Sequence, residues 1–118
     1  MREVVATLPR THGQTHGWLV ADLADAAALR SRVEALTAAA PVQILVNNSG
    51  GPPGGPAHAA AIDAYLDAFH RHLVANQTLV QALLPGMRAA RWGRIVNVIS
   101  TSVYEPIPDL CVSNTIRG

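Results

Sequence analysis

Small polar residues follow two apolar runs of the chain, and their types could support chemistry. Residues 42–46 lead into Asn47-Asn48-Ser49-Gly50, and residues 94–99 lead into Ser100. Such runs are typical of strands buried on both faces of a parallel sheet, where ligands bind at the carboxyl ends. Small side chains there let the backbone approach a ligand, and a serine hydroxyl can polarise a carbonyl group. The same patterns also fit plain turns with local hydrogen bonds.

These polar residues lie within an alternating series of strands and helices. Helical spacing and capping predict a helix over 26–39, with Asp25 as its N-cap, and a long helix that begins near Asp63. Glycine and proline make residues 50–56 a loop. Further elements are expected at 3–8 (end of a helix), 16–20, 42–46 and 94–99 (strands) and just before Gly118 (start of a helix). The order predicts an α/β fold with a doubly wound parallel sheet and right-handed crossovers.

The composition predicts a small domain with small-molecule or protein partners. Of the 118 residues, 49% are hydrophobic and 14% are charged, so a buried core is expected and disorder is not. The net charge of +1 provides no basic surface for nucleic acid, and no apolar run reaches the roughly 18 residues of a membrane span. Cys111 is the only cysteine, so no internal disulfide can form and a cytoplasmic protein is expected.

The histidines do not predict a metal site. His70 and His72 are two residues apart on the long helix, so they point to different faces, and His12 and His16 lie in weakly structured sequence. No carboxylate or second cysteine completes a ligand set, so no bound metal is expected.

Both strand ends resemble signatures of the short-chain dehydrogenase/reductase family. Residues 47–50 are similar to its Asn-Asn-Ala-Gly turn, and residues 93–100 are similar to its serine-ended strand. The resemblance covers nearly the whole chain and implies a Rossmann-like, doubly wound parallel sheet. It also implies that residues 1–118 form a single partial NAD(P)-binding domain. The first two strands, the glycine-rich phosphate turn and the last strands are missing from it.

The missing strands have a consequence for stability. In the strand order of the family, the 16–20 strand pairs with the absent second strand, and the 42–46 strand pairs with the absent first one. Backbone groups of both strands would then lack partners. We therefore hypothesise that the isolated 118 residues do not form a cooperative domain.

The resemblance also implies where NAD or NADP would bind. Asp22 and Leu23 are expected beside the adenine. Asn48, Ser49 and Gly50 are expected to pass close under the cofactor, where small side chains let the backbone approach it.

The catalytic positions of the family are only partly filled in this chain. Ser100 stands at the position of the catalytic serine, whereas Ser113 and Arg117 stand where the family has its tyrosine acid and its lysine. A serine hydroxyl is too weak an acid to replace the phenol, but the permanently charged guanidinium could still hold ribose hydroxyls. We expect cofactor binding to survive these replacements more readily than proton transfer.

Two other residues are candidates for the missing proton chemistry. Alignment of the long helix through residues 83–87 puts His72 where the family has an asparagine that orders a water relay. Since histidine titrates near neutral pH, His72 could take part in a relay, or it could be a core histidine with one local hydrogen bond. Tyr104, the only phenol near Ser100, is the other candidate.

Three functional interpretations follow from these residues. The first is an NAD(P)-dependent oxidoreductase, similar to 3-oxoacyl-carrier-protein reductases, that acts on a small carbonyl or alcohol substrate and forms a homo-oligomer at full length. The second is a catalytically decayed dinucleotide-binding or oligomerisation scaffold. The third is a fragment without activity of its own.

Overall fold

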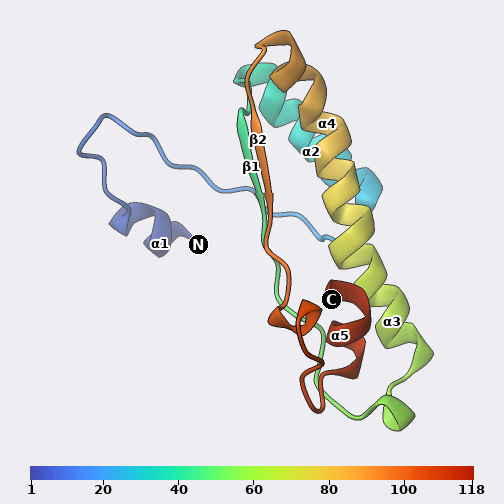
Figure 1. Ribbon diagram of the computed structural model, residues 1–118. Coiled ribbons are helices and arrows are strands. Elements are labelled where there is room, and N and C mark those ends of the chain that lie inside the picture. Colours follow the sequence, from blue (N-terminus) through green and yellow to red (C-terminus); the bar gives the residue numbers. More distant parts are fainter.

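The computed structural model describes residues 1–118 and contains one two-stranded parallel sheet with its two long helices on one face (Figure 1). The strands β1 (Ile44–Asn47) and β2 (Arg94–Asn97) pair in register, from Ile44 opposite Arg94 to Asn47 opposite Asn97. Both strands have four residues and are shorter than the predicted segments 42–46 and 94–99. The predicted α/β fold with a parallel sheet is confirmed.

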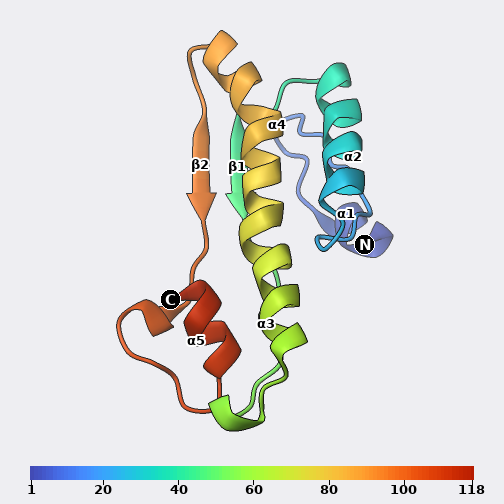
Figure 2. The same cartoon turned by 90° about the vertical axis from the view of Figure 1, so that its right-hand side faces the viewer.

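The helix α2 (Ala26–Ala39) begins at the cap that the sequence predicts. The Asp25 carboxylate accepts a hydrogen bond from the backbone N–H of Ala28 at 2.9 Å, which satisfies one of the free N–H groups of the first turn. After Pro41 the chain enters β1, and α2 packs beside the second long helix on the same face of the sheet (Figure 2).

That second helix connects β1 to β2 and contains a π-helical segment. It consists of α3 (Ile62–Phe69), η2 (His70–Val74) and α4 (Ala75–Ala89), which follow one another without a break. The predicted start near Asp63 is confirmed, because α3 begins at Ile62, but no side chain caps the helix there. The π turns of η2 are wider than α turns, so they change the direction of the side chains that they carry.

The predicted strand over 16–20 is not a strand in the structure. The segment is extended and pairs with neither β1 nor β2, and Trp18, Leu19 and Val20 remain exposed. An apolar segment becomes a strand only where a neighbour accepts and donates its backbone hydrogen bonds, and these 118 residues supply no such neighbour. The preceding helix α1 (Arg2–Thr7) lies away from the other elements (Figure 1).

The apolar core lies between β1 and the helices α2 and α4. Its members are Leu29, Val33, Leu45, Ala75, Leu83 and Met87. Because strand side chains alternate between faces, Ile44 and Val46 point to the other face of the sheet, where they are 58% and 57% exposed. Only one face of the sheet is therefore covered.

The segments after β1 and β2 are connected to each other below the sheet. Three short elements lie there: η1 (Ala57–Ala59), η3 (Thr101–Val103) and α5 (Cys111–Arg117). The backbone N–H of Gly55 donates to the carbonyl of Asp109, and the N–H of Cys111 donates to the carbonyl of Gly55. The glycine-rich loop is thereby fixed to the start of α5, which confirms the helix predicted before Gly118.

The structure buries little surface for a chain of this length. Only 13 of 118 residues are buried, and the accessible surface is 8284 Å², compared with about 6,100 Å² for a folded protein of this mass. The radius of gyration is 16.6 Å, compared with about 13.5 Å for a domain of this length. No helix has both the length and the apolar character that crossing a bilayer requires.

We expect the isolated 118-residue chain to lose its structure gradually on heating, because so small a core offsets little of the conformational entropy of the chain. The measurement is circular dichroism in the far and near ultraviolet during a thermal scan. A sharp transition accompanied by a near-ultraviolet signal would contradict this expectation.

Candidate active site

The two strands end in a pair of asparagines that hold their carboxyl ends together. The side-chain amide of Asn47 donates to the side-chain oxygen of Asn97 at 2.8 Å, and Asn47 is buried. Beyond the pair, the N–H of Val98 still donates to the carbonyl of Asn47 at 2.9 Å. The turns that carry Ser49 and Ser100 therefore leave the same edge of the sheet next to each other.

Ser49 makes a hydrogen bond with His72, which approaches from the helical layer. The distance from Ser49 Oγ to His72 Nδ1 is 3.0 Å, and only 8% of His72 is exposed. His72 lies in the π-helical segment η2, and its neighbour His70 is exposed on another face, as the spacing predicts. The hydrogen bond of His72 is therefore not local, because it joins residues that are 23 positions apart.

The surroundings of His72 favour its neutral form. Burial lowers the pKa of the imidazole below its ordinary value, the positive charge of Arg117 lowers it further, and Asp67 opposes the shift. Neutral imidazole can accept and donate a proton through its two ring nitrogens.

Arg117 connects α5 to both strand ends. Its backbone carbonyl accepts a hydrogen bond from the N–H of Ser100 at 3.2 Å. Its guanidinium lies against the glycine turn, because a Cβ placed on Gly51 would be only 3.1 Å from Arg117 Nη1. A residue with a side chain at position 51 would therefore crowd the guanidinium.

The three hydroxyl candidates differ in their surroundings. Ser100 Oγ accepts a hydrogen bond from the N–H of Ser102 at 3.2 Å, so its oxygen caps η3 while its own proton is left to donate. Ser113 is buried in α5. Tyr104 is 92% exposed at the end of η3, so its phenol points into solvent rather than toward the strand ends.

Asp22 is bound by an arginine of η2. Its carboxylate accepts hydrogen bonds from the N–H of Ala24 and from the guanidinium of Arg71, both at 2.9 Å. The bond from Ala24 lowers the pKa of Asp22 most, and Arg71 lowers it further. Leu23 is partly buried, and its side chain packs against the core.

Arg71 is a site residue that the sequence interpretation missed. It also binds Asp67 at 2.8 Å. The spacing of four residues between Asp67 and Arg71 on a helix would have indicated that pair, whereas no local signal indicates the bond to Asp22.

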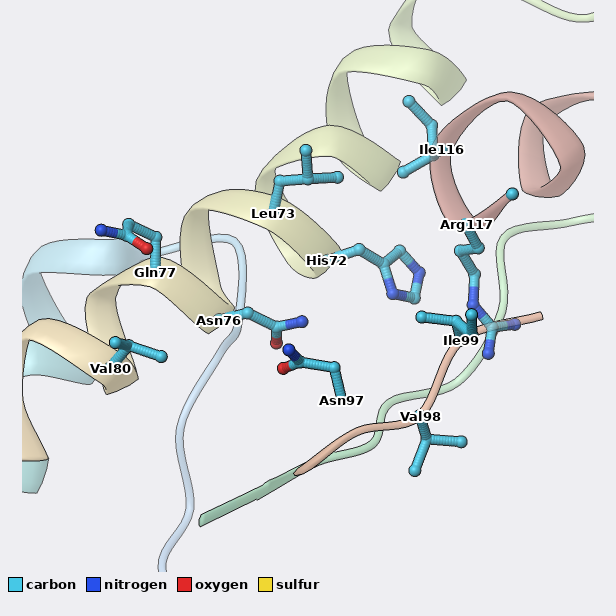
Figure 3. Close-up of a pocket in the computed structure, with 11 residues that line it drawn as sticks. His72, Leu73, Asn76, Gln77, Val80, Asn97, Val98, Ile99, Ile116 and Arg117 are labelled. Carbon is cyan, nitrogen blue, oxygen red and sulfur yellow. The ribbon is translucent and has the colours of Figure 1, made fainter. Parts of the chain in front are cut away.

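A crevice of about 460 Å³ opens between the long helix, the end of β2 and α5 (Figure 3). Its polar lining comes from His72, Asn76, Gln77, Asn97 and Arg117. Figure 3 shows the amides of Asn76 and Asn97 facing each other and the His72 ring turned toward Arg117. Asn48 and Ser100 lie outside this lining. The sequence interpretation also missed Asn76, although it lies one helical turn after His72 and so shares its face.

We expect the pKa of His72 to rise in Arg117→Gln, because loss of the cation removes one of the two causes that lower it. Asp67→Asn is the matched control with the opposite sign, since it removes the charge that favours imidazolium. In the unaltered protein, the pKa of His72 lies below its ordinary value, so the imidazole gains its proton only at a lower pH. The measurement is an NMR titration of the His72 Cε1 proton. A pKa that falls in Arg117→Gln would contradict the arrangement described above.

Comparisons with known proteins agree with the fold of the chain. The family model for short chain dehydrogenases matches residues 1–112. The chain is similar to the 3-oxoacyl-(acyl-carrier-protein) reductase from Agrobacterium tumefaciens C58 solved with NADP bound. Their sequences are 26% identical, the TM-score is 0.82, and the match covers 98% of this chain and 43% of the other. No curated protein matches the chain.

Two further solved structures are also similar. A metagenomic short-chain oxidoreductase in complex with NADP is 29% identical, with a TM-score of 0.81 over 98% of this chain and 51% of the other. The L-sorbose reductase from Gluconobacter frateurii, complexed with NADPH and L-sorbose, has a TM-score of 0.88 over 98% of this chain and 44% of the other, and its 24% identity shows the fold alone. The chain thus spans about half, or less, of the proteins that it matches. With its fold and with a family model that covers nearly all of its residues, the chain belongs to the short-chain dehydrogenase family.

Proposed function

We propose that the chain is the central part of an NAD(P)-dependent oxidoreductase that moves hydride between a nicotinamide and a small carbonyl or alcohol substrate. The observation that carries this proposal is the meeting of three segments at one sheet edge. The Ser49 turn, the Ser100 turn and the end of α5 are joined there by the bonds of Ser100 and the contact of Arg117 with Gly51. Such an edge is where ligands bind in open α/β sheets.

The residues at this edge fit part of a dinucleotide. Asn48 and Gly50 are exposed and small, so a ligand can approach the backbone of the turn. The guanidinium of Arg117 carries several donors that could hold ribose hydroxyls, and Asp22 with the backbone of Leu23 would border the adenine. When bound, a nicotinamide cofactor supplies the hydride chemistry itself. NADP-bound and NADPH-bound neighbours support NAD or NADP as the cofactor.

The hydroxyls and the histidine would handle the substrate oxygen and its proton. Ser100 keeps a donor proton, with which it would polarise a substrate carbonyl. Ser113 occupies the place of the acid but is too weak to act alone, which leaves His72 as the titrating group. The likeness to a 3-oxoacyl-(acyl-carrier-protein) reductase supports a 3-oxoacyl thioester as one substrate to test.

A second candidate function is a binding or oligomerisation scaffold without turnover. It is favoured by Ser113, which is buried and whose hydroxyl is too weak an acid to replace the phenol of the family. It is also favoured by an exposed apolar stripe on the long helix, with members every three or four residues: Ile62, Leu66, Phe69 and Leu73. A second copy of the protein could cover this stripe. Cofactor binding without turnover over a broad substrate panel would favour this function.

We expect Arg117→Gln to weaken NADH or NADPH binding about tenfold, because loss of a charge-assisted hydrogen bond is worth roughly 1.5 kcal/mol or more. The measurement is a titration of cofactor fluorescence. Arg88→Gln, an exposed arginine near the end of α4, is the matched control and should leave the affinity unchanged. Equal affinities for all three proteins would remove Arg117 from the cofactor site.

We expect Ser100→Ala to lower kcat by about a hundredfold, since removal of one donor to a developing oxyanion has effects of this size. Ser100→Thr retains the hydroxyl and the η3 cap, so it should keep more activity. The assay follows NAD(P)H consumption with a ketone. His72→Ala and Tyr104→Phe test the replacement acids, and unchanged activity in both would exclude both candidates.

A further inference from the structure

Three positions at which the chain departs from the family motifs lie in one cluster. Ser49 replaces the alanine of the Asn-Asn-Ala-Gly turn, His72 replaces the asparagine of the long helix, and Arg117 replaces the lysine. Ser49 is hydrogen-bonded to His72, and the charge of Arg117 acts on His72. Residues that are 23 and 45 positions from His72 along the chain therefore act on one imidazole.

The geometry gives the two ring nitrogens of His72 different surroundings. Nδ1 faces Ser49 Oγ at 3.0 Å, at the sheet edge. Nε2, on the other side of the ring, makes no hydrogen bond to the protein, while the ring lines the crevice shared with Asn76 and Arg117 (Figure 3). The imidazole thus lies between the sheet edge and the crevice, and it contacts a hydroxyl only on the side of the sheet.

The charges around the ring favour one tautomer. Arg117 approaches from α5 and Asp67 from α3, and these are the charged groups that act on His72. A guanidinium has only hydrogen-bond donors and no acceptor. Nε2, the ring nitrogen on the crevice side, is therefore favoured without a proton, so that its electron pair is free. The proton of the neutral ring would then be on Nδ1, where it can be donated to Ser49 Oγ.

We propose, on the basis of the proposed function, that His72 and Ser49 form the proton relay of this site. The relay would bring a proton from the crevice to the substrate oxygen. In the reducing direction, a reduced nicotinamide cofactor would supply the hydride when bound, and the substrate oxygen would take the proton of the Ser49 hydroxyl. Ser49 Oγ takes the Nδ1 proton of His72, and Nε2 takes a proton from water in the crevice. One proton is moved from solvent to substrate, and alcohol oxidation reverses each step.

The first test observes the relay without cofactor or substrate. The full-length protein is labelled with ¹⁵N. Long-range NMR correlations then report which ring nitrogen of His72 carries the proton. We expect the proton on Nδ1 in the wild type and a shift toward Nε2 in Ser49→Ala. Ser49→Thr keeps the hydroxyl and should keep the wild-type tautomer, and Ser31→Ala, an exposed serine on α2, is the neutral control. A wild-type ring protonated on Nε2 would overturn the relay.

The second test is kinetic and separates a relay from a structural contact. We expect Ser49→Ala to lower kcat about a hundredfold with little change in KM, as for loss of general acid–base catalysis. Ser49→Thr should restore most of the rate, and the pH dependence due to His72 should disappear in Ser49→Ala. In a protein that already carries His72→Asn, Ser49→Ala should lower kcat no further, because both substitutions interrupt the same relay.

The outcomes distinguish this proposal from the function on which it rests. Fully additive effects of the two substitutions, or a normal rate in Ser49→Ala, would overturn the relay and leave the oxidoreductase in place. A wild-type protein that binds no NADH or NADPH would overturn the proposed function itself. In that case the NMR result would show whether Ser49 and His72 are coupled for another purpose.

Discussion

The parallel pairing of β1 with β2 is the constraint on which the rest of the structure depends. It places Asn47 opposite Asn97, and so it brings the turns after them to one edge of the sheet. A slip of one residue would exchange the faces of the strand, which would expose the buried Leu45 and bury Ile44 instead. The core of Leu45 with α2 and α4 therefore selects the register, and the register creates the site.

The elements that depend on local interactions could be predicted from the sequence. Asp25 caps α2 as expected, because a side-chain cap requires only residues within one turn. The 16–20 segment has the composition of a strand, but a strand also needs a neighbour, and composition cannot show whether one is present. The π turns of η2 could not be predicted either, since the apolar spacing through His72 is compatible with an ordinary α-helix.

The candidate site likewise has features that could be predicted from the sequence and features that depend on tertiary contacts. The residue types at the strand ends, and their resemblance to a family turn, indicated Ser49, Ser100 and Arg117 as site residues. The contacts between them depend on how far a helix rotates above the sheet, so the Ser49 bond to His72 and the Arg71 bond to Asp22 had no local signal. Whether the long helix carries a core histidine or a functional one is decided by this tertiary contact rather than by the periodicity.

The charge properties of the side chains limit where a proton can be exchanged. Of the residues that line the crevice, asparagine and glutamine do not titrate, and Arg117 keeps its charge at every pH at which proteins fold. The hydroxyls of Ser49 and Ser100 hold their protons too tightly to ionise alone. Burial and the positive charge of Arg117 lower the pKa of His72 and favour the neutral ring, yet they leave both nitrogens able to exchange protons. Proton traffic between this crevice and the sheet edge must therefore pass through His72 or through water.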